Sequence, residues 1–162
     1  MPNSLIPDRE AEFLLNEVID AESLCALPAF ADYSSESFEM YIESCRRFAR
    51  EELLPAYKPM DEEKPRFSDG RITLHPLMKT LYPKLIELGV VSAARPFEVG
   101  GGKIPQSVAT LANLYVMGAK LNGSGLTGLS TGAARLIEAF GDETLRTTFL
   151  EPMMSGEWAG TM

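Results

Sequence analysis

The chain has 162 residues, of which 45% are hydrophobic and 23% are charged, and its formal net charge is -8. These values are typical of an ordinary globular domain and exclude the disordered and fibrous classes. A negative field repels phosphate backbones and anionic lipids, so we expect no nucleic-acid partner and no binding to a membrane surface.

The sequence also contains no targeting or membrane signal. Residues 1–10 mix Pro, Asp, Arg and Glu without the apolar stretch of a secretory signal. No apolar run approaches the about 20 residues of a membrane span. Cys25 and Cys45 lack metal-ligand spacing and do not suggest a disulfide framework, so we expect reduced thiols. The sequence therefore predicts a cytoplasmic protein with no membrane span and no metal site.

Helical patterns dominate the first third of the chain. A first helix is expected around residues 10–19. Ser34 and Ser35 can cap the next helix, because Glu36 then stands in the first turn, where the helix dipole favours an anion. Pro55 is expected to kink or end that helix. Its apolar face consists of residues at helical spacing: Phe38, Tyr41, Ile42, Cys45, Ala49 and Leu53.

The middle of the chain begins with a polar segment. Residues 58–70 are dense in charge, Pro and Gly and are predicted to form a solvated connection. Pro76 is placed to open the next helix, where its missing N–H has no cost, and Gly89 is placed to close it. Pro83 should kink or split this helix. We expect a surface or capping role for His75, the only histidine.

Further helices are predicted in the last third of the chain. Residues 90–104 form an irregular loop, and a helix over 105–122 is expected to be interrupted by Gly123. Asp142 caps a final helix that ends at Pro152. Between them lies a helix whose apolar stripe comprises Leu126, Leu129, Ala133, Leu136, Ile137 and Phe140. Short Gly or Pro breaks between helices, with no convincing strand pairs, predict an all-α multi-helix domain.

The tail is the exception to the helical pattern. In residues 157–162, Trp158 and Met162 fall on one face of an extended segment. A strand needs a partner, and the chain offers none before this point. We therefore expect this segment to begin a β region, and the chain to be a piece of a larger protein.

Two glycine patterns point to other functions. Residues 123–128 match G-x-G-x-x-G, which cradles a pyrophosphate only between a strand and a helix. Residues 128–132 match G-x-S-x-G, which needs a preceding strand and a later histidine base. The preceding segment has helical periodicity, and His75 lies upstream, so both patterns lack their structural context. A dinucleotide-binding protein that uses Gly123 to Gly128 remains an alternative hypothesis.

A series of motifs in a fixed order carries a family resemblance. Its members are Glu52-Leu53-Leu54-Pro55, then Leu88-Gly89-Val90 with Arg95-Pro96-Phe97-Glu98-Val99-Gly100-Gly101, then Gly141-Asp142-Glu143 through Phe149-Leu150-Glu151-Pro152, and finally Ser155 to Met162. In this order the motifs resemble the amino-terminal helical domain of the acyl-CoA dehydrogenase family. The resemblance implies three parts: an amino-terminal extension over 1–33, the helical domain over 34–156, and the start of a truncated central β domain over 157–162.

The extension resembles one subgroup of the family, the enzymes that oxidise 3-(methylthio)propionyl-CoA and related acyl-CoAs. The similar residues are Asp8, Phe13, Leu15, Glu17 and Val18, followed by Leu27-Pro28-Ala29-Phe30.

The resemblance implies α,β-dehydrogenation of an acyl-CoA thioester. In the family a carboxylate base takes the α-proton, the β-hydride passes to FAD, and an electron-transfer flavoprotein receives the electrons. The base is expected outside this segment, so no catalytic residue is predicted here. The chain alone is expected to be inactive, to lack bound FAD and to contribute contacts of a homo-oligomer. A non-catalytic helical interaction module is the second alternative.

The resemblance also suggests site residues. The acyl chain of the family's substrate runs beside helices of this domain, and Met162 stands at the first position of the strand that contacts the flavin. For Tyr115 and Met117, a purely structural role in the core is an equally open interpretation. The candidates for the wall of the acyl pocket are Asn113, Tyr115, Val116, Met117, Thr127, Ser130 and Thr131.

Overall fold

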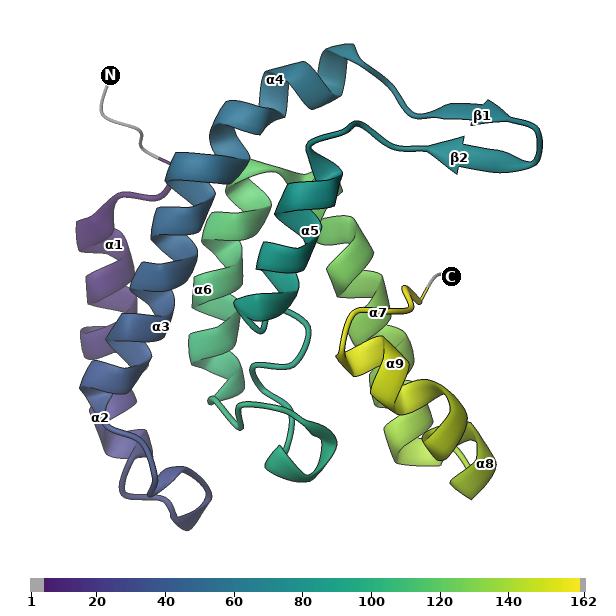
Figure 1. The fold of residues 1–162 in the computed structure, drawn as a ribbon. Coiled ribbons are helices and arrows are strands. Elements are labelled where there is room, and N and C mark those ends of the chain that lie inside the picture. Colours follow the sequence, from purple (N-terminus) through teal and green to yellow (C-terminus); the bar gives the residue numbers. More distant parts are fainter. Residues whose placement is uncertain (1–4, 161–162) are drawn as a thin grey trace.

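The structure is a computed structural model that describes residues 5–160, with the backbone alone for residues 121–124 and 126. It is mostly helical and contains a single two-stranded sheet within the described residues, which confirms the all-α prediction. In Figure 1, helices α1, α3, α6 and α5 lie beside one another, and α7 to α9 extend the body on one side.

The amino-terminal region forms a helix that packs into the core. Helix α1 (Asp8–Phe13) continues through the π-helical turn η1 (Leu14–Val18), so the expected first helix is confirmed and begins two residues earlier than predicted. Helix α2 (Ala21–Leu24) and the 3-10 turn η2 (Pro28–Phe30) follow. Ala11, Leu15 and Ala21 are buried in the main core, where they join the extension to the rest of the molecule.

Helix α3 (Ser35–Phe48) begins with the predicted cap. Ser34 Oγ accepts a hydrogen bond from Ser37 N at 3.2 Å, and Ser37 Oγ accepts in return from Ser34 N. The helix continues through the π-helical turn η3 (Ala49–Leu53) into α4 (Leu54–Glu62). Pro55 therefore does not end the helix, because the wider turn before it accommodates the missing N–H.

Two elements occupy most of residues 58–70, which were predicted as a solvated connection. Helix α4 includes residues 58–62, and a β-hairpin begins at Arg66. Strands β1 (Arg66–Ser68) and β2 (Arg71–Thr73) pair antiparallel, with Phe67 opposite Ile72. Asp69 and Gly70 have φ angles of 51° and 74°, the positive values of a two-residue hairpin turn. The prediction of no strand pair is wrong here. Figure 1 shows the hairpin projecting away from the helices.

Helix α5 (Met78–Glu87) starts two residues after Pro76 and is not split by Pro83. His75 lies in the turn before the helix, where its Nδ1 accepts a hydrogen bond from Leu77 N at 3.2 Å, and the N-cap residue Leu77 has no side-chain cap. Gly89 ends the helix with φ of 72°, as predicted.

Helices α6 (Gln106–Ala119) and α7 (Leu121–Phe140) follow the irregular loop, which includes the 3-10 turn η4 (Phe97–Val99). The break between them falls at Lys120, whose backbone is extended, and not at Gly123. Lys120 is buried, with Nζ 4.9 Å from the centre of the Tyr57 ring and 3.4 Å from Tyr57 O. This tertiary contact had no signal in the local sequence.

The chain ends in short helical pieces packed on α7. Asp142 caps α8 (Glu143–Leu145) as predicted, accepting from Leu145 N at 2.8 Å. The π-helical turn η5 (Arg146–Leu150) leads into α9 (Glu151–Met154), so Pro152 again follows a π-helical turn instead of ending the helix.

The expected strand in the tail is absent from its described part, residues 157–160. Gly160 N instead donates a hydrogen bond to Ser130 Oγ at 3.0 Å. A Cβ added at Gly160 would lie 2.8 Å from Ala133 Cβ, so only glycine permits this close approach to α7. Thr161 and Met162 lie outside the described residues.

Two apolar clusters hold the fold together. The main core forms where α3 packs on α6, with Phe38, Leu85 and Val108 fully buried. A smaller cluster joins α7 to η5 and α9: Val91, Ala134, Leu150, Met153 and Met154. The stripe predicted on α7 is only partly buried, because Leu136 is 63% and Phe140 83% exposed.

Candidate functional site

A cavity of about 260 Å³ lies between α6, α7 and the loop that follows α5. Four of the seven predicted wall residues line it: Asn113, Met117, Thr127 and Thr131. They come from two helices, and α3 closes the inner end with Tyr41 and Cys45. The structure therefore brings together side chains that are far apart in the sequence.

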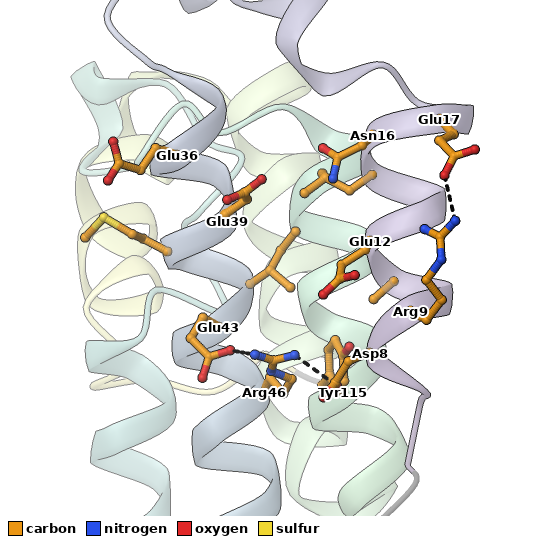
Figure 2. Close-up of a pocket in the computed structure, with 14 residues that line it drawn as sticks. Asp8, Arg9, Glu12, Asn16, Glu17, Glu36, Glu39, Glu43, Arg46 and Tyr115 are labelled. Carbon is orange, nitrogen blue, oxygen red and sulfur yellow. Dashed lines mark hydrogen bonds and ion pairs between the residues drawn. The ribbon is translucent and has the colours of Figure 1, made fainter.

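The other three predicted wall residues lie elsewhere. Asn113 and Met117 are four residues apart and share one face of α6, whereas Tyr115 and Val116 point to other faces. Val116 is fully buried in the main core. Tyr115 lines a different groove, beside Asp8 and Arg46 (Figure 2). Ser130 is buried against the tail through its hydrogen bond with Gly160.

Hydrogen bonds fix the side of the cavity formed by α7. Thr131 Oγ1 lies 2.9 Å from Thr127 O, one turn earlier in the helix, and 3.3 Å from Val91 O in the loop. The hydroxyl can donate to either carbonyl, so it links helix α7 to the loop.

The inner end of the cavity is uncharged at neutral pH. Burial raises the pKa of the Cys45 thiol to about 11, and burial also raises the pKa of Tyr41. Asn113 Oδ1 is buried without a hydrogen-bond partner among the described residues, which leaves one acceptor beside the cavity. The helical spacing of Tyr41 and Cys45 predicted only that they lie on the apolar face of α3. This spacing contains no information about the cavity that they also border.

Two arginines stand at the rim. Arg95 pairs with Glu138, and Arg135 donates a hydrogen bond to Gln106 Oε1. Burial, together with the nearby charge of Arg135, lowers the pKa of Arg95. The described lining contains no carboxylate that could act as a general base. The cavity can hold a small neutral group below a cationic rim.

The described residues offer no metal centre, since none of their His, Cys, Asp and Glu side chains form a group of three. No helix within residues 5–160 is long and apolar enough to cross a membrane. A flavin dinucleotide does not fit the cavity, whose volume is below the about 300–1,000 Å³ of pockets for drug-sized ligands. The predicted flavin contact, Met162, lies outside the described residues.

Comparison with known proteins gives the family. Residues 35–157, more than half of the chain, match the family described as "Acyl-CoA dehydrogenase, N-terminal domain". The chain belongs to the acyl-CoA dehydrogenase family. This confirms the resemblance inferred from the order of motifs, and it agrees with the helical architecture.

Individual members of the family are similar over almost the whole chain. The 3-methylmercaptopropionyl-CoA dehydrogenase of Ruegeria pomeroyi is 26% identical over 156 residues, which cover 96% of this chain and 26% of that protein. Two butyryl-CoA dehydrogenases of Syntrophomonas wolfei are 27% and 28% identical, each over 99% of this chain and 27% of their own length. The chain thus spans about a quarter of the length of these relatives.

Proposed function

We propose that this chain forms one wall of the acyl pocket in an FAD-dependent acyl-CoA dehydrogenase. The observation that carries the proposal is the cavity between α6 and α7, where Asn113, Met117, Thr127 and Thr131 meet. Its neutral inner end suits an uncharged acyl chain, and the absence of a carboxylate from its described lining agrees with a catalytic base elsewhere in the enzyme.

The substrate class rests on the relatives. One acts on 3-methylmercaptopropionyl-CoA and two on butyryl-CoA by their names, and both substrates have short acyl chains. A cavity of about 260 Å³ is in keeping with a short chain. We therefore propose a short acyl-CoA, of the methylthio-substituted or simple aliphatic kind, as the substrate.

The remaining parts of the proposal come from the family. FAD accepts the hydride when it is bound, an electron-transfer flavoprotein takes the electrons, and the chain alone is inactive. An exposed apolar surface on α7 and the tail, which includes Leu136, Phe140 and Trp158, supports a further domain or subunit that covers it. A homo-oligomer and a cytoplasmic location stay predictions.

The proposal is tested by filling the cavity in the enzyme that contains this chain. Met117→Trp places a larger side chain against the acyl wall, and KM for a short acyl-CoA should rise at least about tenfold. Met40→Trp is the matched control, since Met40 lies on α3, is 64% exposed and does not border the cavity. Equal kinetics for both variants and the unmodified enzyme would refute the role of this cavity.

The dinucleotide-binding alternative has no structural support. Residues 123–128 lie inside helix α7, and the preceding element is helix α6. The turn between a strand and a helix that this motif needs is therefore not formed. The interaction-module alternative would instead be favoured if the enzyme that contains the chain showed no acyl-CoA oxidation.

A further inference from the structure

The hairpin of β1 and β2 projects from the helices as an arm, residues 64–74, with both of its faces open (Figure 1). All six strand residues are exposed, so no helix within the described residues covers either face. The two ends of the arm meet at its base, where His75 Nε2 lies 3.6 Å from Glu63 Oε2. A two-stranded hairpin alone is marginally stable in water, and packing against another surface stabilises it. The described chain does not supply that surface.

One face of the arm is apolar. Phe67 lies directly opposite Ile72 in the register, and residues that are directly opposite share one face of a sheet. Phe67 is 75% and Ile72 68% exposed, and Leu74, which follows the second strand, is 44% exposed. An aromatic and two aliphatic side chains gathered on a projecting element are typical of a surface that contacts another protein.

The opposite face of the arm is cationic. Arg66 and Arg71 alternate with Phe67 and Ile72 along the strands and therefore lie on the other face. Lys64 precedes the first strand. None of these three cations forms an ion pair with another described residue. The arm contains one carboxylate, Asp69, so its charges give a positive surplus.

The rest of the chain has the opposite sign. The chain contains 15 Lys and Arg residues against 23 Asp and Glu residues, and its net charge is -8. Because the arm itself is positive, the helical body is more negative than this value. The body also exposes apolar side chains, such as Phe13 and Val18, that can cover those of the arm. Opposite charges on the arm and the body favour and orient their association.

We propose that the hairpin is a docking arm that packs its apolar face against the acidic helical body of a second copy of this chain. Each copy carries both an arm and an acidic body, so one contact satisfies the complementarity of both surfaces. Pairing of two arms is disfavoured, since it brings the cations of Arg66 and Arg71 close to their equivalents. Nucleic acid and anionic lipid attract the arm but are repelled by the body.

Sedimentation velocity of the 162-residue chain at low ionic strength tests the charge of the arm. We expect self-association that weakens at least about fivefold in about 0.5 M NaCl. The double variant R66E/R71E should weaken it at least about tenfold. The control R47E/K79E reverses the same charge at exposed positions on α3 and α5 and should change it less than about twofold. Equal weakening by both double variants would overturn the proposal.

A second pair of variants separates the arm from the exposed apolar surface of α7. F67S/I72S should weaken self-association at least about tenfold, because it removes the apolar face of the arm. L136S/F140S removes two exposed apolar side chains of α7 and should leave self-association within about twofold. The opposite result would assign the contact to α7 and overturn the proposal. Circular dichroism confirms that each variant keeps its helices.

A shortened chain separates docking on the body from pairing of two arms. In this variant two glycines replace residues 66–73, so that the arm is lost and the body is kept. Two shortened chains should not associate, whereas a labelled unmodified chain should still bind the shortened one. No binding in this mixture would show that arm pairs with arm. Sedimentation of the unmodified chain with phosphatidylglycerol vesicles, without self-association, would assign the arm to a lipid surface, and either result would overturn the proposal.

Discussion

Asp8 Oδ1 lies 2.6 Å from Arg50 Nη2, and this ion pair joins the amino-terminal extension to the helix that follows α3. Asp8 Oδ2 accepts a second hydrogen bond from Arg50 Nη1 at 3.2 Å, which makes the contact bidentate. Arg46 Nη1 adds a third contact at 2.9 Å, and Arg50 also donates to Ile6 O at 3.0 Å. One carboxylate thus fastens the extension to two arginines.

Replacing this carboxylate should loosen the extension. Asp8→Asn removes the charge and one acceptor, and we expect the free energy of unfolding to fall by about 1 kcal/mol, because the side chain is partly exposed and solvent screens the pair. Glu17→Gln is the control, since its pair with Arg9 is mostly exposed and should contribute less than about 0.5 kcal/mol. Urea unfolding measures both, and equal losses would contradict the prediction.

The same pair predicts a dependence on pH. The hydrogen bond from Arg50, followed by contributions from Arg46, lowers the pKa of Asp8 below its ordinary value of 3.8. A lowered pKa in the folded state stabilises the fold above the pKa of the unfolded state, and this contribution is lost as pH falls through the folded value. The difference between the unmodified chain and Asp8→Asn should therefore be constant from about pH 5 to 7 and shrink below about pH 4. A constant difference down to pH 2 would argue against it.

The cap of α3 gives a second stability prediction. Ser34→Ala removes the acceptor for Ser37 N, and we expect a loss of about 1 kcal/mol in the free energy of unfolding. Ser35→Ala tests the neighbouring serine, which lies inside the helix and makes no cap hydrogen bond, and should have little effect. A larger loss for Ser35→Ala would place the cap one residue later.

Two glycines should respond oppositely to alanine. Gly89 has φ of 72°, so Gly89→Ala is strained and should cost about 1 kcal/mol. Gly118 lies in the interior of α6 with nothing within 4 Å of an added Cβ, so Gly118→Ala should stabilise the chain by about 0.5–1 kcal/mol. Thermal unfolding should show a lower Tm for the first variant and a higher Tm for the second. Shifts of the same sign would contradict the assigned conformations.

The two cysteines should differ in reactivity. Cys45 is 1% exposed and its pKa is raised to about 11 by burial, whereas Cys25 is partly exposed. A thiol reagent such as Ellman's reagent at pH 8 should therefore modify one thiol in the native chain and both in urea. Cys25→Ser should abolish the reaction of the native chain, and Cys45→Ser should leave it unchanged. Rapid modification of Cys45 would show that the cavity between α6 and α7 admits the reagent.

The sequence by itself determined the features that depend on local signals. Chemistry within a few residues predicted four features: the cap at Ser34, the cap at Asp142, the end of α5 at Gly89 and the apolar face of α3. The order and spacing of the motifs predicted the family, although each motif alone is a weak signal. The family resemblance suggested Asn113 and Met117, which lie four residues apart on one face of α6.

Only the tertiary structure decided the remaining features, since each depends on contacts between distant segments. The break between α6 and α7 falls at Lys120, whose side chain is buried against Tyr57. A π-helical turn precedes each of Pro55 and Pro152, and the helix continues through both prolines. The cavity lined by Asn113 and Thr131 forms only where α3, α6, α7 and the loop after α5 meet. Tyr115 lines a separate groove beside Asp8 and Arg46 because α1 and α3 meet there, and no spacing along the chain predicts this contact.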